Sequence, residues 1–589
     1  MFGRRGRFAL LGLFLLMLAA ALIEALAVAS VLPLVAGLTG DAGSQQLGGR
    51  MGALAGAGRI TPLVAVFCVA VVAGILLRVL SDYTSTAFSW AQNVRWSRRL
   101  LRVHLNSDYE AFLGRHSAEI GYGLLGRVQE VVSGSLLPGL RLIVNVLVVL
   151  CICGVLLRTL PPMVLLGVAG IAILYCGIFL GLRKRLSSLG KEREIISATR
   201  FRLVSEIFGG IKEIKLHGLE AAYDARTRVP FDRHAALQSQ RHLLSILPRY
   251  LFEAIGFIAL CLVVLLLGAS DTGVGSVLPT LGMVGFAAFR LLPALQQVYQ
   301  NAVPLPIGLP ALDTLHAELM AGQDGLAAEP VPLELQREIA LSDAHYSYPG
   351  AQRPSVDGVD LRIAARTTVA LVGTSGAGKS TLADLTIGLL APTRGSLAID
   401  GVVLDAAARR AWRANCAYVP QQVFLLDDSI AANIAFGLPE HQRDMQRVES
   451  AARAAALHDF VAGSLPDGYA TRIGERGVRL SGGQRQRIGI ARALYRDAAY
   501  LVLDEATNAL DPGTEAEVML ALDRLSGTRT VLVIAHRLST VERCDRVLLV
   551  DHGRIIADGR YQDLMRDSAA FRRFANADAA AGTLRLVVP

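Results

Sequence analysis

Cysteine is scarce in this chain. Seven cysteines are scattered over 589 residues, and two of them, Cys151 and Cys153, lie inside an apolar run. No group of cysteine and histidine residues has the spacing of metal ligands. The sequence therefore argues against a disulfide framework and against a zinc site.

Acidic residues are also in the minority. Aspartate and glutamate total 50, lysine and arginine total 59, and the formal net charge is +9. A basic chain of this kind binds either nucleic acid or an anionic membrane surface. Many of the arginines flank apolar runs, which favours cytoplasmic segments beside lipid headgroups and argues against a nucleic acid partner.

Apolar residues, by contrast, are abundant. They make up 52% of the chain, and the mean hydropathy is positive. The excess is concentrated before about residue 300 of the sequence, which predicts a membrane half followed by a soluble half.

Six apolar segments have roughly the 20 residues that a helix needs to cross the hydrocarbon core. They are residues 10–38, 63–83, 137–157, 162–182, 243–267 and 277–299. An even number of spans returns the soluble half to the side of the N-terminus. The first apolar run is too long for a cleaved signal peptide and follows three arginines, so we expect an uncleaved span in the inner (cytoplasmic) membrane, with the N-terminus and the soluble half in the cytoplasm.

Two long connections, residues 84–135 and 184–242, are rich in arginine and lysine and fall on the cytoplasmic side, in agreement with the positive-inside rule. Their helical periodicity predicts helices that continue out of the membrane, turn and return. We expect the turns at 117–127 and 217–226. Each turn either docks onto the soluble half or is a plain surface loop.

Several polar residues lie within the predicted spans. They are Glu24, Arg78, Arg141, Asn145, Arg249, Glu253 and Arg290. An ionisable group at bilayer depth costs at least about 2.5–3.5 kcal/mol, so it normally faces a partner or a wet cavity. We predict that Arg78, Arg249 and Arg290 bind a phosphate of the substrate, because guanidinium binds phosphate bidentately. The alternative is that they reach the interface or pair with Glu24 and Glu253.

A change of pattern separates the two halves. Residues 304–336 contain five prolines and lose the apolar density, which predicts a linker. From about residue 339, short strands alternate with helices, which is typical of an α/β domain with a largely parallel sheet. The expected organisation is a helical transmembrane domain at 1–303, a linker at 304–336, an α/β domain at 337–577 and a C-terminal tail at 578–589.

The α/β domain begins with a phosphate-binding loop. The apolar strand 368–372 leads into G-x-x-x-x-G-K-[ST], and a helical pattern follows, which is the context that this motif requires. Backbone N–H groups of the loop face phosphate oxygens, Lys379 bridges the β- and γ-phosphates, and the Ser380 hydroxyl ligates Mg²⁺. The predicted phosphate-binding residues are Gly373, Thr374, Ser375, Gly376, Ala377, Gly378, Lys379, Ser380 and Thr381.

Further candidates follow strands or begin helices. Asp504 and Glu505 end the apolar strand 500–504, where Asp504 can hold Mg²⁺ through water and Glu505 can polarise the attacking water. Gln421 follows the strand 417–419 and can reach the same Mg²⁺ or water. His536 ends the strand 530–534, where γ-phosphate contacts belong in an open α/β sheet. Tyr348 either stacks on a nucleobase or packs in the core.

A second helix start can bind phosphate. It consists of Ser481, Gly482, Gly483 and Gln484, and an arginine-rich helix follows it. The serine hydroxyl and the glycine amides face the same way as the positive end of the helix dipole.

The motifs GTSGAGKST, LSGGQ, LVLDEAT, NALD and IAHRLS occur in this order. Together they resemble the nucleotide-binding domain of the ATP-binding cassette (ABC) transporters over residues 337–577. The resemblance implies ATP and Mg²⁺ as cofactors, with the magnesium residues Ser380, Gln421 and Asp504. It also implies that Tyr348 stacks on the base and that Glu505 is the catalytic carboxylate.

The same resemblance assigns the remaining motif positions. Gln421 is the Q-loop residue, His536 the switch histidine and Asp511 the D-loop residue. Asn508 stands where the D-loop more often has serine. Glu475 and Arg476 lie in a stretch, IGERG, that contacts the transmembrane domain in this family.

The six spans with two cytoplasmic extensions look like the exporter fold of this family, and one membrane half with one cassette makes a half-transporter. In the family, the LSGGQ motif acts on ATP held by the opposite cassette, so the implied partner is a second copy or a related half-transporter. The complete set of catalytic motifs implies an ATPase coupled to transport. An ATP-gated channel or regulator is the alternative.

The membrane half has a finer resemblance. GGIKEIKL (209–216), PRYLFEAIGF (248–257) and FRLLP (289–293) are similar to flippases of lipid-linked oligosaccharides. The implied substrate is a polyprenyl-pyrophosphate-linked oligosaccharide. Export of another lipid, a glycolipid or a peptide is the alternative.

Overall fold

The structure is a computed structural model that describes residues 4–39, 60–159, 162–268, 289, 291–322, 330–506, 512–523, 527–535 and 537–584. The chain divides into two units. The first comprises Met1–Ser107 and Arg115–Leu326, and the second comprises Asp108–Gly114 and Ala327–Pro589.

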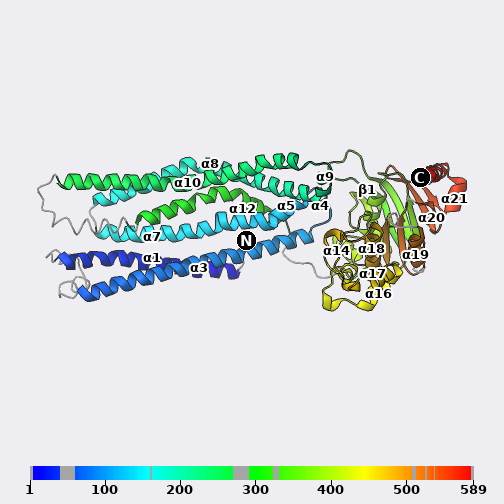
Figure 1. Cartoon of the computed structure of the whole chain (residues 1–589), viewed down its shortest axis with the longest axis horizontal. Coiled ribbons are helices and arrows are strands. Elements are labelled where there is room, and N and C mark those ends of the chain that lie inside the picture. The colour runs from blue at the N-terminus through cyan, green and yellow to red at the C-terminus, as the bar shows by residue number, and fades with distance from the viewer. Residues whose placement is uncertain are drawn as a thin grey trace. The chain divides into compact units, whose positions relative to one another are not determined.

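The described part of the first unit is helical, and its long helices run side by side (Figure 1). The helices are α1 (Arg4–Thr39), α3 (Ile60–Asn106), α5 (Ser117–Gly121), α6 (Val128–Val131), α7 (Leu137–Thr159), α8 (Pro162–Gly209), α9 (Ile211–Leu216), α10 (Glu220–Gly268) and α12 (Pro304–Ala321), with π-helical segments η2 (Tyr122–Arg127) and η3 (Val132–Leu136) between α5 and α7. Residues 291–302 are also helical and lead into α12.

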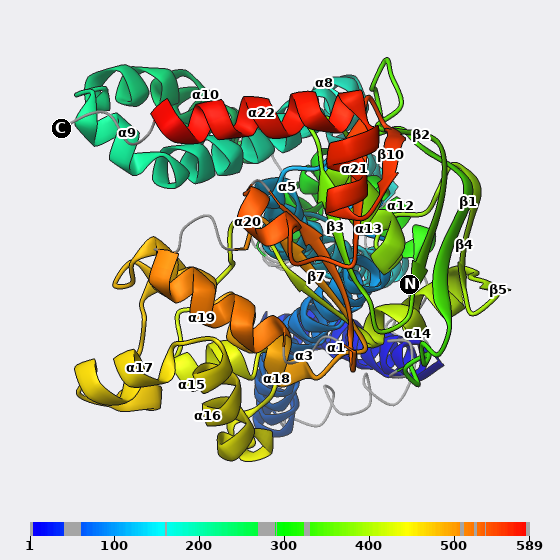
Figure 2. The same ribbon diagram turned by 90° about the vertical axis from the view of Figure 1, so that its right-hand side faces the viewer.

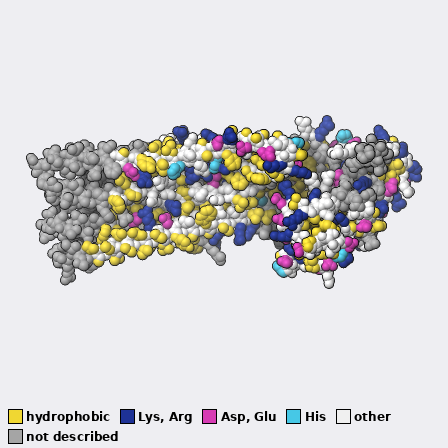
Figure 3. Space-filling view, viewed as in Figure 1, with side chains coloured by type: hydrophobic (Ala, Val, Ile, Leu, Met, Phe, Trp, Pro, Cys, Tyr) yellow, Lys and Arg dark blue, Asp and Glu magenta, His cyan; other side chains and the backbone are white. Residues whose placement is uncertain are grey.

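Five of the six predicted spans lie within α1, α3, α7, α8 and α10. The sixth, 277–299, falls largely outside the described residues, and its described part is helical. Within the described residues, three segments are long and apolar enough to cross a membrane: Gly6–Ser30, Val64–Asn106 and Ser117–Val155. Apolar side chains such as Leu11, Val69 and Leu76 are exposed on α1 and α3, and hydrophobic atoms are prominent along these helices in Figure 3. This surface suits contact with lipid.

The helices of the first unit enclose an apolar core. Met17 of α1, Ile152 of α7, Leu186 of α8 and Ile307 of α12 are buried together. A residue without a side chain lets two helix backbones approach closely. At the contact of α8 with α12, a Cβ atom added to Gly190 would lie 2.3 Å from the carbonyl oxygen of Ile307.

We expect Gly190→Ala to destabilise the first unit by about 1–3 kcal/mol, because the added methyl group collides with backbone that has no flexible end to move. Gly181 on the same helix has no atom within 4 Å of an added Cβ, so Gly181→Ala should be neutral or stabilising by up to about 1 kcal/mol through helix propensity. The melting temperatures of the two detergent-purified variants test this. Equal melting temperatures would contradict the close contact of α8 with α12.

One predicted turn is misplaced, and the predicted linker begins too early. Residues 117–127, expected as a turn, form α5 and η2, and the chain turns before them, around α4 (Glu110–Leu113). The segment Asp108–Gly114 belongs to the second unit, where Glu110 Oε1 accepts a hydrogen bond from Ala391 N at 3.4 Å. The linker predicted at 304–336 does contain the boundary between the two units, after Leu326, but its first half is helical, because α12 buries Leu315 and Leu319 against Trp96 and Leu100 of α3.

The second predicted turn, 217–226, is placed better by the sequence. Helix α9 ends at Leu216 and α10 begins at Glu220. Between them Gly218 has φ +62°, a left-handed conformation that glycine adopts without strain. The turn therefore occupies the start of the predicted range, and the rest of that range is the first part of α10.

The second unit contains two sheets. A six-stranded sheet has the order β10-β9-β3-β8-β7-β6 and is parallel except for β10. A four-stranded antiparallel sheet has the order β2-β1-β4-β5. The strands are β1 (Glu338–Tyr346), β2 (Val356–Ala364), β3 (Thr368–Val372), β4 (Arg394–Ile399), β5 (Val402–Val403), β6 (Cys416–Val419), β7 (Tyr500–Asp504), β8 (Thr530–Ile534), β9 (Arg546–Asp551) and β10 (Arg554–Gly559).

Helices cover the parallel sheet. They are α13 (Lys379–Ile387), α14 (Ala406–Ala414), α15 (Ile430–Ile434), α16 (Met445–Ala454), α17 (His458–Ser464), α18 (Gly482–Arg496), α19 (Pro512–Asp523), α20 (Leu538–Val541), α21 (Tyr561–Asp567) and α22 (Ala569–Leu584). In Figure 2, α15 to α18 lie on one side of this unit, and β1, β2 and β4 lie on the other. Every residue of β7 and β8 is buried, as expected of parallel strands covered on both faces.

Candidate functional site

The phosphate-binding loop has the geometry that its sequence predicts. Gly378 has φ +103° and caps the N-terminus of α13, and an added Cβ would lie 2.3 Å from the carbonyl oxygen of Ser355. The Lys379 ammonium donates to the carbonyl oxygens of Gly373 at 2.8 Å and Thr374 at 3.0 Å. Burial lowers the pKa of Lys379, while the carboxylates of Glu505 and Asp504 oppose that shift.

Strand register brings the other predicted groups to the loop. Asp504 at the end of β7 is opposite Ile534 of β8, and Ile534 is opposite Leu371 at the end of β3. The carboxyl ends of these parallel strands therefore share one edge of the sheet. The loop after β3 and the carboxylates after β7 meet at this edge, as the sequence predicts.

The two carboxylates differ in environment. Asp504 is buried, which raises its pKa, although hydrogen bonds with Tyr418 and Ser380 oppose the shift. The Tyr418 hydroxyl donates to Asp504 Oδ2 at 3.1 Å. Glu505 adopts a positive φ of 50°, and its Oε2 accepts a hydrogen bond from Gln421 Nε2 at 2.7 Å. Asp504 and Ser380 thus supply paired oxygen donors, which is the chemistry that Mg²⁺ prefers, and Gln421 orients Glu505.

Tyr348 lies beside the helix that follows the loop. Its hydroxyl is 3.2 Å from Thr381 Oγ1, and its ring packs edge to face with Tyr346 at 5.1 Å. The ring is half-buried, so it combines a packing contact with an accessible part for stacking.

The predicted second helix start is a capping box. Ser481 Oγ accepts from Gln484 N at 3.2 Å, and Gln484 Oε1 accepts from Ser481 N at 2.8 Å. Gly482 also lines a cleft of about 580 Å³ together with Gln421 and Arg476. In the described part of the chain, no hydrogen bond or ion pair joins residues 481–484 to the loop 373–380.

Two predicted residues fall outside the described residues, namely Asp511 and His536. Strand β8, after which His536 follows, does end at the edge of the sheet that carries the loop.

One ionisable residue near this site was not among the residues that the sequence predicts for it. Asp384 on α13 is half-buried, and desolvation together with the nearby Asp504 raises its pKa to about 6. The side chain also acts electrostatically on Tyr109, Tyr346 and Tyr418. An aspartate in a helix carries no motif signal, because its burial depends on residues far away in the sequence.

We expect Asp384→Asn to stabilise the second unit by about 1–3 kcal/mol above pH 7, since the folded state then avoids burying a charge. The sign follows from the raised pKa: below the ordinary pKa the carboxyl is protonated in both states, and the cost of ionisation grows as the pH rises through about 6. The stabilisation should therefore be greater at about pH 8 than at about pH 5. Thermal unfolding of the full-length variant tests this, with the exposed Asp427→Asn as control. A stabilisation independent of pH would contradict it.

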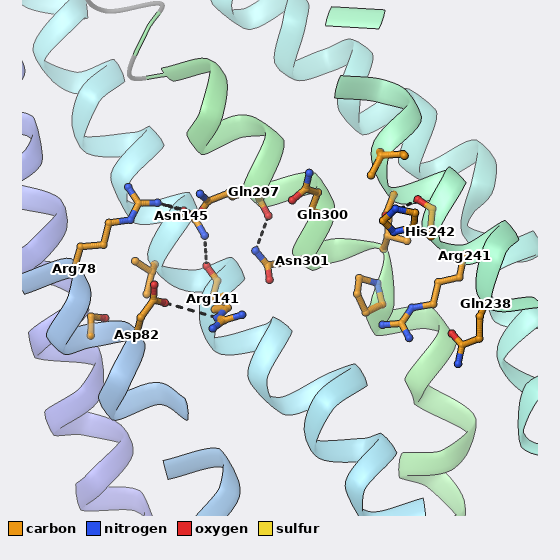
Figure 4. A pocket seen from close by; sticks show the side chains of 16 residues that line it. Arg78, Asp82, Arg141, Asn145, Gln238, Arg241, His242, Gln297, Gln300 and Asn301 are labelled. Atoms are coloured by element: carbon orange, nitrogen blue, oxygen red, sulfur yellow. Dashed lines mark hydrogen bonds and ion pairs between the residues drawn. The ribbon is translucent and has the colours of Figure 1, made fainter. Parts of the chain in front are cut away.

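The first unit contains a polar pocket of about 760 Å³. We call it the arginine pocket, because its walls carry three arginines: Arg78, Arg141 and Arg241. Five carboxamide side chains also line it: Asn145, Gln238, Gln297, Gln300 and Asn301. Asp82 is the carboxylate among its lining residues. The side chains labelled in Figure 4 come from α3, α7, α10 and residues 291–302.

The three arginines predicted to bind substrate do not form one cluster in the described residues. Arg78 lines the pocket but is paired with Glu24 at 3.0 Å. Arg249 is not a lining residue, and it pairs with Glu253 one turn along α10 at 2.8 Å. Arg290 falls outside the described residues. The pocket instead brings Arg141 and Arg241 together with Arg78, and Arg241 lies just before the predicted fifth span.

Two family models match successive parts of the chain. The ABC transporter transmembrane region matches residues 10–287, and the ABC transporter domain matches residues 356–508. The chain therefore belongs to the ABC transporters, with the half-transporter arrangement of one transmembrane region followed by one nucleotide-binding domain.

Curated relatives agree with this family, and a solved structure shares the fold. Proteins named ATP-dependent lipid A-core flippase are 37% identical in Cupriavidus pinatubonensis and 39% identical in Cupriavidus metallidurans, each over 65% of this chain. The match spans 65% and 64% of these relatives, just under two thirds of their length. A bacterial Atm1-family ABC exporter, solved with ATP bound, has the same fold, with a TM-score of 0.80, 24% identity and coverage of 97% of this chain and 98% of that chain.

Proposed function

We propose that this chain hydrolyses ATP to flip a lipid-linked, phosphate-bearing glycan across the inner membrane, with its N-terminus and nucleotide-binding domain in the cytoplasm. The observation that carries the proposal is the arginine pocket, a polar cavity whose lining arginines outnumber its carboxylate, among helices whose outer faces are apolar. Phosphate suits guanidinium groups and sugar hydroxyls suit carboxamides. The lipid tail can stay against the apolar exterior.

The edge of the parallel sheet supplies the energy-coupling site. Lys379 would bind the β- and γ-phosphates, and Ser380 and Asp504 would hold Mg²⁺, which offsets phosphate charge. Glu505 accepts the proton of the attacking water, and Gln421 keeps its carboxylate in place through the 2.7 Å hydrogen bond. The working unit is a dimer with a second copy or a related half-transporter.

Two cargoes fit the proposal. Stretches such as PRYLFEAIGF favour a polyprenyl-pyrophosphate-linked oligosaccharide, and the names of the relatives favour lipid A-core. Both join a lipid tail to a phosphorylated sugar.

Purified protein in liposomes tests the proposal. Fluorescent undecaprenyl-pyrophosphate trisaccharide and fluorescent lipid A-core should each be offered, and movement between leaflets should require ATP and be absent in Lys379→Ala. ATP-dependent movement of either cargo supports the function and identifies the glycan. If neither cargo moves although ATP is hydrolysed, the proposed function is wrong.

A further inference from the structure

The polar side chains of the arginine pocket are of two kinds. Some are fully engaged with other side chains of the protein, and some have no partner among the described residues. A polar group withdrawn from bulk water is costly when it lacks a partner. The distinction therefore separates groups that build the wall from groups that are available to a ligand.

Arg78 is of the first kind. Its Nη1 donates to Glu24 Oε1 at 3.0 Å, and its Nη2 donates to Gln297 Oε1 at 2.9 Å and to Asn145 Oδ1 at 3.4 Å. Asn145 also donates to the carbonyl oxygen of Arg141 at 2.7 Å. Glu24 neutralises the charge of Arg78, so this arginine joins α1, α3, α7 and residues 291–302 and adds little positive potential to the cavity.

Arg241 is of the second kind. No carboxylate of the described residues lies within 4.0 Å of its guanidinium, and it makes no side-chain hydrogen bond with them. The neighbouring charges that act on it are Arg193 of α8 and Glu130 of α6. Glu130 is already bound by Arg193 at 3.2 Å and by the Tyr122 hydroxyl at 3.1 Å. No carboxylate of the described residues therefore pairs directly with Arg241.

Three further groups are available at the pocket. Gln238 lies one turn before Arg241 on α10, Gln300 lies on the facing helical segment (Figure 4), and neither makes a side-chain hydrogen bond with the described residues. Arg141 Nε is buried without a hydrogen-bond partner, and the nearest ion pair of Arg141 is a long one, 3.7 Å to Asp82. The pocket volume of about 760 Å³ lies within the range of small-ligand sites.

We propose that Arg241 and Arg141 bind the phosphate of the cargo and that Gln238 and Gln300 bind its sugar hydroxyls. Arg78 holds the helices of the pocket wall together and does not bind the cargo. This assignment rests on the proposed function and specifies its ligand-binding groups. It predicts selectivity for a molecule with both phosphate and sugar over one with either alone. The two chemistries should also be separable by mutation.

The test measures lipid binding to the full-length protein in nanodiscs. Three probes share one tail: undecaprenyl-pyrophosphate trisaccharide, undecaprenyl pyrophosphate, and the same trisaccharide on a neutral undecaprenyl ether. Arg241→Gln should reduce the preference for the phosphorylated glycan over the neutral one roughly tenfold to a hundredfold. Gln300→Leu should reduce the preference for the glycosylated pyrophosphate over the bare one about twofold to tenfold.

Matched controls lie on the same helical segments. Arg249→Gln removes an arginine of α10 that does not line the pocket, and Gln296→Leu removes a neighbouring amide that does not line it. Both controls should keep the wild-type preferences. Glu24→Gln combined with Arg78→Gln removes the wall pair without leaving an unpaired charge and should also keep the phosphate preference.

A second variant decides the matter if Arg241→Gln fails to fold. Gln238→Glu places a carboxylate one turn from Arg241, where it can neutralise the guanidinium, and should abolish the phosphate preference with Arg241 still present. Unchanged preferences in Gln238→Glu or in a folded Arg241→Gln would overturn the assignment. The proposed function stands in that case if the wild type still flips the glycolipid, and it fails separately if the wild type flips none.

Discussion

Replacing Glu505 with Gln should lower steady-state ATP hydrolysis by about a hundredfold or more, because a positioned general base contributes roughly 10²–10⁴ to the rate. The substitution keeps the shape of the side chain and removes its ability to accept a proton. The amide oxygen of the new glutamine can still accept the hydrogen bond that Gln421 now donates to Glu505 at 2.7 Å. The loop 373–380 is unchanged, so ATP binding should persist.

The measurement pairs turnover with nucleotide binding. Purified Glu505→Gln should retain ATP and accumulate as the ATP-bound dimer, whereas Lys379→Ala should lose binding itself. Glu517→Gln makes the same chemical change at an exposed position of α19 and is the control for charge. Wild-type turnover in Glu505→Gln would show that another group activates the water.

The arrangement of residues at this edge of the parallel sheet was predictable because its signals are local. The strands β3, β7 and β8 begin and end where the apolar runs predict, and parallel pairing alone then brings Lys379 and Glu505 to one edge. The glycines of the loop also match their conformations. Gly378, for example, has a positive φ and a close backbone contact that leave no room for a side chain.

The membrane half was less predictable because partners there are distant in sequence. Arg78 and Glu24 are separated by 54 positions, and Arg78 and Gln297 by 219. Arg249 and Arg241 are both arginines of α10, yet only Arg241 lines the pocket, and its neighbours Glu130 and Arg193 are far away along the chain. The cost of burying a charge identifies charged residues in the spans as candidates for ligand binding. Tertiary packing then determines which of these residues line the pocket.

Dependence on distant partners also explains why the start of the linker and the first cytoplasmic turn were misplaced. The prolines of α12 suggested a linker. Pro304 and Pro306 lie in the first turn of the helix, where proline is tolerated, and packing against α3 stabilises a helix that also contains Pro310. The turn predicted at 117–127 was misplaced because the break around α4 is short, and the helical periodicity on either side of it does not show where it falls. The π-helical segments η2 and η3 carry no sequence pattern that differs from an α-helix.

Mixing subunits that carry Lys379→Ala with subunits that carry Ser481→Arg should restore ATP hydrolysis that neither variant shows alone. Ser481 caps α18, a helix of 15 residues whose positive end can bind phosphate. The serine oxygen accepts from Gln484 N at 3.2 Å, which leaves its own O–H free to donate to a phosphate. No described contact joins this helix start to the loop of its own chain, so its phosphate should come from a second cassette.

The amount of activity recovered distinguishes an ATP site shared between two subunits from an ATP site built within a single chain. If each ATP lies between Lys379 of one subunit and Ser481 of the other, a mixed dimer has one doubly impaired site and one intact site. Random pairing makes about half of the dimers mixed, so at most about one quarter of wild-type hydrolysis should return. A mixture of Lys379→Ala and Glu505→Gln subunits is the control. Both residues lie at the same ATP site of one cassette, so every site in a mixed dimer then carries a defect. Equal background activity in both mixtures would contradict the shared site, whereas recovery in the Ser481→Arg mixture alone requires that the two subunits build each ATP site together.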